Sequence, residues 1–299
     1  MINLRRWIVI AVPFFWLLAL FLIPFFTVFK ISLSDLAVAR PPYVPTLDLS
    51  GGLSAIKEFL SQLDFENFAW LVSDDLYINA YLSSLKIALI STVISLMIGF
   101  PIAYGMARVA VEWRPTLMML VILPFWTSFL IRIYAWIGIL KSEGLLNQFL
   151  LWLGVIDTPL VILNTNIAVY IGIVYAYLPF MILPIYATLE KLDGSLLEAA
   201  EDLGCSRFSA FWLITAPLAR PGIIAGCFLV FIPAVGEFVI PDILGGSDTL
   251  MIGKILWTEF FSNRDWPVAS AVAVVLLLVL IIPIVMFQKF QERQQQADA

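Results

Sequence analysis

The chain has 299 residues, of which 62% are hydrophobic and only 13% are charged, and its mean hydropathy is +0.97. Soluble domains carry about 25% charged residues, so this composition indicates a polytopic membrane protein. A formal net charge of −5 without a long run of lysine or arginine argues against nucleic-acid binding, and the lack of histidine removes the usual metal ligand and general base.

The first predicted element is a membrane helix over residues 7–29. Arg5 and Arg6 precede this apolar run, which is long enough to cross the hydrocarbon of a bilayer. A secretory signal peptide would have a shorter apolar core and a small-residue cleavage site, and the run has neither. Residues 30–78 are then expected to form a long external loop with a short helix around 56–63.

Five further membrane helices are predicted, at about 80–106, 117–140, 167–189, 221–240 and 267–287. A short amphipathic helix over 145–153 and an external segment over 242–265 lie between some of them. We therefore expect an all-α polytopic membrane protein with six transmembrane helices. Its expected parts are a first helix with its external loop (1–78), a five-helix core (79–290) and a polar cytoplasmic tail (291–299).

The distribution of basic residues predicts the orientation, because short loops rich in lysine and arginine stay in the cytoplasm. One side holds more of these residues in much less chain. Both termini and the loop over about 190–220 are therefore expected in the cytoplasm. The inner set is Arg5, Arg6, Arg108, Arg114, Lys191, Arg207, Arg220, Lys289 and Arg293, and the outer set is Lys30, Arg40, Lys57, Lys141, Lys254 and Arg264.

The loop over 190–220 contains the most informative motif. Ser195 and Glu198 have the spacing of a capping box, which predicts that a short helix begins there. Gly204 follows where a helix can end in a left-handed turn. The stretch resembles the EAA loop of bacterial ABC importer permeases, written E-A-A-x3-G-x9-I-x-L-P. The matching residues are Glu198, Ala199, Ala200, Gly204, Ile214 and Pro217, and Ala216 replaces the usual leucine.

This resemblance implies a location in the bacterial inner membrane and a type I ABC importer permease fold, in which the loop is a coupling helix that docks on a cytoplasmic ATPase. From the residues alone, a capped surface helix between two membrane spans is the alternative. The chain has no phosphate-binding loop, since Gly253-Lys254 lacks both the upstream glycine and the following Ser or Thr. ATP hydrolysis is therefore expected in a separate chain, and neither enzymatic activity nor a cofactor is expected here.

Glu237 is the first candidate for the substrate path, because it lies inside or near the outer end of the predicted fifth helix. A charge at mid-membrane costs about 2.5–3.5 kcal/mol on insertion scales, so it usually lines a pathway or pairs with a partner. Two interpretations remain open, an ion pair with Arg132 or an interfacial arginine, and a contact with a transported cation. Asp242 follows in the same stretch, P-A-V-G-E-F-V-I-P-D.

Trp126, Tyr134 and Trp136, on the outer half of the predicted third helix, are further candidates. Their rings could face ammonium groups, although Trp and Tyr also gather at membrane interfaces. These stretches, with 244–246 and 263–270, resemble the polyamine branch of the importers over about 81–286, first the putrescine and next the spermidine permeases. In that branch the permease is half of a heterodimer and works with two ATPase copies and a periplasmic polyamine-binding protein.

Acids outnumber bases in the predicted external loops, which would concentrate a dication but also suits ordinary solubility or a docking face. Three alternatives remain. One is an ABC importer of another solute, such as an amino acid or an iron chelate; for an anion, only Arg132 and Lys86 offer positive charge on the path. A secondary transporter would predict inverted repeats and paired broken helices, and an intramembrane enzyme lacks a catalytic set. The acids are Asp35, Asp48, Glu58, Asp64, Glu66, Asp74, Asp75, Glu143, Asp157, Asp242, Asp248, Glu259 and Asp265.

Overall fold

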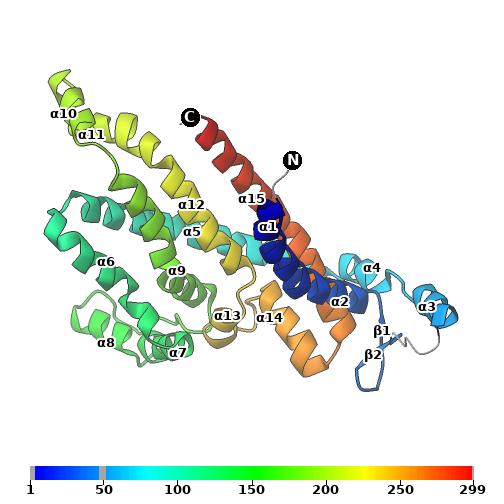
Figure 1. The fold of residues 1–299 in the computed structure, drawn as a ribbon. Helices are drawn as coiled ribbons and strands as arrows, with labels where there is room; N and C mark the ends of the chain where they lie inside the picture. The colour runs from blue at the N-terminus through cyan, green and yellow to red at the C-terminus, as the bar shows by residue number, and fades with distance from the viewer. Residues whose placement is uncertain (1–3, 47–51, 298–299) are drawn as a thin grey trace. The chain divides into compact units, whose positions relative to one another are not determined.

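The computed structural model describes residues 4–46 and 52–297, and helices make up most of it (Figure 1). The chain forms two compact units, Met1–Asn79 with Ile255–Val279, and Ala80–Lys254 with Leu280–Ala299. We call them the first and the second unit.

The first unit begins with a long apolar helix made of α1 (Leu4–Leu17), a π-helical turn η1 (Leu18–Leu22) and α2 (Ile23–Ser32). The predicted external loop then contains more structure than the one helix expected around 56–63. An antiparallel hairpin of β1 (Asp35–Leu36) and β2 (Tyr43–Val44) precedes helices α3 (Gly52–Ser61) and α4 (Glu66–Ser73). Strands of two residues are too short to show an alternating pattern, so the sequence did not predict them.

Hydrogen bonds within the first unit hold these short elements together. The side-chain amide of Asn67 on α4 donates to the carbonyl oxygens of Ser32 and Ser34, at 3.1 and 2.9 Å. The buried Tyr77 donates its hydroxyl to Glu259 at 3.1 Å and packs edge-on against Trp70. Glu259 belongs to η6 (Thr258–Asn263), after which α15 (Trp266–Ala297) begins.

The second unit contains the other helices. In chain order these are α5 (Asp75–Arg108), η3 (Val111–Trp113), α6 (Arg114–Ile122), η4 (Leu123–Trp126), α7 (Phe129–Leu140), α8 (Leu145–Trp152), α9 (Asn166–Leu189), α10 (Ser195–Asp202), α11 (Arg207–Ala210), η5 (Phe211–Thr215), α12 (Ala216–Val235), α13 (Val239–Ile243) and α14 (Ile252–Trp257). The first residues of α5 and the last of α14 belong to the first unit.

Within the described residues, five helical segments are long and apolar enough to cross a membrane, and a sixth results if one bent pair counts as a single span. The five are Val9–Ser32, Asp75–Arg108, Asn166–Leu189, Arg207–Val235 and Trp266–Met286. The segment that ends at Val235 starts and stops earlier than the predicted 221–240. Pro221 lies inside it, and Pro217 near the start of α12.

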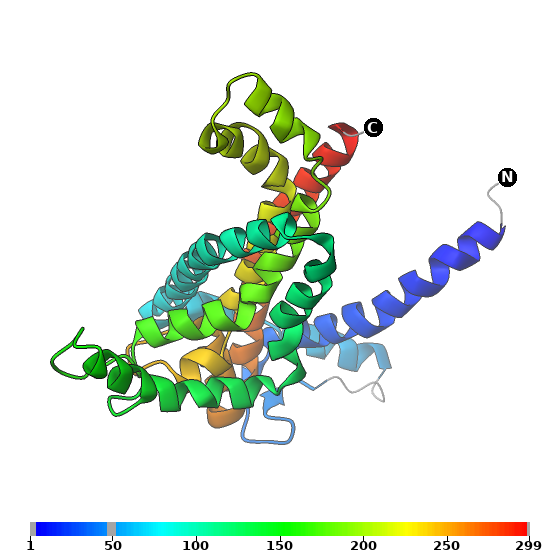
Figure 2. The ribbon, with the colours of Figure 1, turned by 90° about the vertical axis from the view of Figure 1, so that its left-hand side faces the viewer.

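The predicted continuous third helix, 117–140, is wrong. The chain bends by 89° between the segments Val111–Trp126 and Phe129–Trp152, a bend that Figure 2 shows between α6 and α7. Thr127 and Ser128 have extended backbone conformations at this bend. Pro124 lacks an N–H and favours a helix start over a helix interior, and the Thr127 hydroxyl donates to the Pro124 carbonyl at 2.8 Å.

The core of the second unit lies where α5, α9 and α12 meet around the buried Met181, Ile185 and Val230. Gly222 and Gly226 let α12 approach α9 closely. A side chain at Gly222 would collide with the backbone around Pro184 and with Thr188, and one at Gly226 with Met181. The G-x-x-x-G step therefore packs two membrane helices together.

The two ends of α9 and α12 carry different structures. Figures 1 and 2 show α10 and α11 at one end, and α7 and α13 at the opposite end. The two sets of candidate residues divide between these ends.

Candidate functional site

The helix of the EAA-like motif is α10, and its N-terminus differs from the prediction. The N-cap residue is Gly194, whose carbonyl accepts the N–H groups of Leu197 and Glu198 at 3.0 and 3.2 Å. Asp193 accepts the Ser195 N–H at 3.0 Å, and bonds from the Ser195 backbone and side chain lower the pKa of Asp193. The predicted capping box of Ser195 and Glu198 is therefore wrong, because the cap lies before Ser195.

The C-terminus of α10 is as predicted. Gly204 has φ = +81°, in the left-handed region that favours glycine. Its N–H donates to the Glu201 carbonyl and the Cys205 N–H to the Ala200 carbonyl, both at 2.9 Å. These two bonds define a Schellman motif, which satisfies carbonyls that the end of the helix would leave free.

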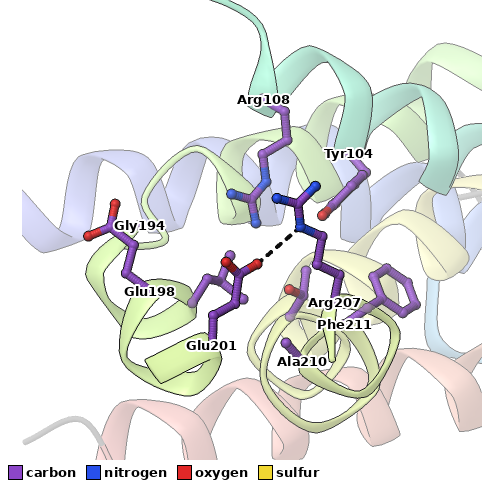
Figure 3. Close-up of a pocket in the computed structure, with 10 residues that line it drawn as sticks. Tyr104, Arg108, Gly194, Glu198, Glu201, Arg207, Ala210 and Phe211 are labelled. Carbon is purple, nitrogen blue, oxygen red and sulfur yellow. Dashed lines mark hydrogen bonds and ion pairs between the residues drawn. The ribbon is translucent and has the colours of Figure 1, made fainter. Parts of the chain in front are cut away.

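A cavity of about 330 Å³ lies beside α10 (Figure 3). Arg108 from α5 and Arg207 from α11 extend toward Glu201, and the Arg207 Nε lies 3.3 Å from the Glu201 carboxylate. The Arg108 guanidinium also lies 5.1 Å from the centre of the Tyr104 ring. Exposed ion pairs contribute little stability, so these contacts orient α10 without fixing it rigidly.

The motif residues divide between two elements. Glu198, Ala199 and Ala200 lie on α10, with Ala200 buried and the other two exposed. Leu203, which follows the helix, is 89% exposed, although an apolar residue of a short helix usually needs cover. The last two motif residues lie outside α10, Ile214 in η5 and Pro217 at the start of α12, and both are half-buried.

At the other end of α9 and α12, Glu237 lies in the loop between α12 and α13 and is 7% exposed. One carboxylate oxygen accepts the N–H groups of Val239 and Ile240, at 3.0 and 3.3 Å. The other accepts a short hydrogen bond from the Tyr177 hydroxyl on α9. Glu237 thus caps α13 and joins the end of α12 to α9.

The Glu237 carboxylate also lines a cavity of about 400 Å³. Most of the remaining wall is aromatic, and we call this the Glu237 cavity. A carboxylate among π faces is an arrangement that suits an organic ammonium group. The rings come from Phe125, Phe129, Tyr177, Phe180 and Phe238.

Arg132 does not neutralise Glu237. Among the residues that the structure describes, no ion pair joins the two. The Arg132 guanidinium lies instead 5.4 Å from the ring centre of Phe125 and 5.8 Å from that of Phe129, the two phenylalanines from the bend between η4 and α7. Its Nε is buried and has no hydrogen-bond partner in the described part of the chain. Arg132 therefore lies against two rings of the aromatic wall and forms no ion pair with any described residue.

None of the other predicted substrate residues lines the Glu237 cavity. Trp126 and Tyr134 are 72% and 58% exposed, and Trp136 packs edge-on against Tyr175. Asp242 lies on α13 and forms an exposed ion pair of 3.7 Å with Lys254.

The rings that do line the cavity were not singled out from the sequence. Phe125 and Phe129 lie on either side of the predicted Trp126, and Tyr177 and Phe180 lie on either side of Pro179 on α9. A pair of aromatic residues three apart on a helix could have signalled one ring-lined face. Nothing in their spacing relates them to Glu237.

Comparisons with known proteins agree with this architecture. A family model described as "Binding-protein-dependent transport system inner membrane component" matches residues 6–294. The chain is 48% identical, over 215 residues, to the "Spermidine/putrescine transport system permease protein PotB" of Escherichia coli (strain K12), a match that covers 72% of this chain and 78% of that protein.

Two solved structures have a similar fold at 17% sequence identity. A bacterial ABC transporter involved in the import of the acidic polysaccharide alginate has a TM-score of 0.67, covering 95% of this chain and 96% of that one. A bacterial alginate ABC transporter in complex with alginate pentasaccharide-bound periplasmic protein has a TM-score of 0.63, covering 97% and 98%. The expected all-α, type I ABC importer permease fold is thereby confirmed.

Proposed function

Because the chain belongs to the family of binding-protein-dependent transport system inner membrane components, we propose that it is the permease subunit of an ATP-driven polyamine importer. The substrate is putrescine or spermidine, with putrescine still the prediction from sequence. The observation that carries this proposal is the Glu237 cavity, a buried carboxylate surrounded by aromatic rings. The spermidine/putrescine permease named above supports the same substrate class.

The chemistry of the cavity suits a polyamine better than an anion. An ammonium group that leaves water needs a negative partner, which Glu237 supplies, and ring faces attract the same charge. The methylene groups between two ammonium groups are apolar and match aromatic walls. None of the residues that line the cavity is a lysine or an arginine, so a sulfate-like or carboxylate solute would find no positive partner there.

The opposite end of α9 and α12 would serve energy coupling. In this role α10 would dock in a groove of a cytoplasmic ATPase, where the exposed Leu196 and Leu203 would gain apolar cover. Movement of α10 would then reach the Glu237 cavity through α9 and α12, which pack closely at Gly222 and Gly226. Both termini would lie in the cytoplasm.

The full machine would contain a second permease subunit, two ATPase copies and a periplasmic polyamine-binding protein. The solved alginate transporter with a bound periplasmic protein supports the last of these partners by fold alone. An importer of an amino acid or an iron chelate is the alternative within the family. An amino acid would require a partner for its carboxylate, and the residues of the Glu237 cavity offer none.

The test is uptake by the reconstituted complex in proteoliposomes, across putrescine, spermidine, lysine and glutamate. We expect uptake and stimulated ATP hydrolysis with the two polyamines and neither with glutamate. Glu237→Gln should lower polyamine uptake at limiting substrate by about tenfold or more, since it removes the charge but keeps the shape. Glu143→Gln, the same change at an exposed position, is the matched control. Transport of glutamate, or full uptake by Glu237→Gln, would contradict the proposal.

A further inference from the structure

The segment around Arg264 has no role in the Glu237 cavity or the coupling helix. Arg264 stands between η6 and α15 with φ = +56°, a left-handed conformation that is uncommon for residues other than glycine. Asp265 fixes the start of α15 by accepting the Val268 N–H at 3.0 Å. Such backbone outliers tend to persist where the surrounding structure and function require them.

Arg264 shares two adjoining cavities of the first unit with Arg40 from the β1–β2 hairpin, and together these cavities form a single surface. One cavity, of about 480 Å³, lies along the hairpin residues Leu36 to Arg40, and the other, of about 490 Å³, is lined by Phe260, Phe261 and Trp266. We call the surface the Arg40–Arg264 patch.

Both guanidinium groups of the patch are available for binding. Arg40 and Arg264 are exposed, and neither forms an ion pair among the residues that the structure describes. Asp35 and Asp265, the described acids nearest to these arginines in sequence, form no ion pair with either of them. Asp35 lies beside Asp64 and Glu66, with ligand oxygens within 4.8 Å of one another, and Asp265 caps α15.

The patch also has the apolar character of a protein interface. Phe260 and Trp266 stack with their ring planes 3° apart and their centres 5.1 Å apart, which gives a rigid aromatic base. Phe261 is 55% exposed, and Val38 at the hairpin tip is fully exposed. Arginine and large aromatic residues are the side chains most enriched at the centres of interfaces.

We propose that the Arg40–Arg264 patch is the docking surface for the acidic rim of the binding protein that delivers the polyamine. This inference rests on the proposed function, including the external location of the hairpin. A protein that carries a polycation must hold it with carboxylates, and further carboxylates at the rim of its cleft are part of the proposal. The predicted external loops of this chain are also acidic, and like charges would oppose contact. Two unpaired guanidinium groups supply the attraction that docking needs, because each can bind a carboxylate through two hydrogen bonds.

The test uses the full complex in lipid nanodiscs and measures ATP hydrolysis against the concentration of polyamine-loaded binding protein. The double variant Arg40→Glu/Arg264→Glu should raise the half-saturating concentration by about tenfold or more, with the basal and saturated rates near normal. Lys57→Glu, the same charge change on the exposed face of α3, is the matched control and should leave the concentration unchanged. Added salt should weaken docking of the unmodified complex and strengthen docking of the double variant, because salt also screens the repulsion between its two glutamates and the acidic rim.

A charge reversal on the partner completes the test. Replacing rim carboxylates of the binding protein with lysine should restore tight docking to the double variant and weaken docking to the unmodified complex. An unchanged half-saturating concentration in the double variant would overturn the inference. A docking defect that depends on the anionic lipid content of the nanodiscs, and not on the binding protein, would also overturn it. So would a docking defect in Arg40→Gln/Arg264→Gln that is accompanied by a reduced basal rate of ATP hydrolysis. If polyamine-loaded binding protein fails to stimulate even the unmodified complex, the proposed function itself fails.

Discussion

The Tyr177 hydroxyl on α9 donates a hydrogen bond to the carboxylate of Glu237, which follows α12. This bond joins two membrane helices at the Glu237 cavity, because Tyr177 also contributes its ring to the wall. The carboxylate is thus held in place before any cation arrives. A cation entering the cavity meets an oriented acceptor and need not reorganise it.

Tyr177→Phe removes the hydroxyl and keeps the ring, so it tests the two groups separately. Loss of a hydrogen bond to a charged group should reduce stability by about 1.5–3 kcal/mol, while polyamine uptake should persist at a reduced rate because the ring and Glu237 remain. Tyr177→Ala should reduce uptake much further. Thermal unfolding in detergent and uptake at limiting polyamine measure the two effects. Equal uptake by the two variants would show that the ring face makes no contribution.

Arg132 offers a test of whether Glu237 serves as a counter-ion. Because Arg132 lies against Phe125 and Phe129 and forms no ion pair with Glu237, Arg132→Gln should not restore uptake or folded yield to Glu237→Gln. The single variant Arg132→Gln should perturb the aromatic wall and alter the apparent affinity for polyamine. Yield of monodisperse protein and uptake are the measurements, and restoration in the double variant would establish a charge pair.

Gly204→Val should uncouple transport from ATP hydrolysis. The left-handed backbone at φ = +81° costs roughly 1–2 kcal/mol for a residue with a Cβ, although no neighbouring atom would touch that Cβ. The end of α10 should therefore reorient while the protein still reaches the membrane. Gly105→Val is the control, because Gly105 lies inside α5 with open space around it and no positive φ. Pull-down of the ATPase and uptake in cells measure the effect. Normal uptake by Gly204→Val would refute the coupling role of α10.

The start of α10 predicts a difference between two neighbouring side chains. Asp193→Ala removes the acceptor for the Ser195 N–H and should weaken ATPase binding, whereas Ser195→Ala keeps that bond and should have a smaller effect. A larger loss of ATPase binding in Ser195→Ala than in Asp193→Ala would contradict this prediction and favour the capping box of Ser195 and Glu198.

The same cap has a defined pH dependence. Because folding lowers the pKa of Asp193, its contribution to stability is present above the unfolded-state pKa and is lost as the pH falls through the folded value. The contribution of Asp193 to the stability of α10 should therefore not change with pH near neutrality. Pull-down of the ATPase from neutral to mildly acidic pH checks this. A loss of ATPase binding near neutral pH that occurs in the unmodified protein but not in Asp193→Ala would contradict it.

The sequence alone located five of the six predicted membrane helices, the EAA-like motif and the left-handed end at Gly204. Hydropathy over some twenty residues and the conformational freedom of one glycine are local properties, so they can be recognised without knowing what packs where. The cap was predicted at Ser195, one residue after the observed N-cap Gly194, because the carboxylate of Asp193 and the hydroxyl of Ser195 can both accept hydrogen bonds at the start of a helix.

Only the tertiary structure decided which groups surround Glu237. Its rings come from the bend before α7, from α9 and from the loop after α12, segments far apart in the chain. The bend at Thr127 turns Phe125 and Phe129 toward α9, and the neighbouring Trp126 remains exposed. Spacing along a helix shows which residues share a face, but packing determines which faces meet. For that reason the sequence left open an ion pair between Arg132 and Glu237, which the structure does not contain.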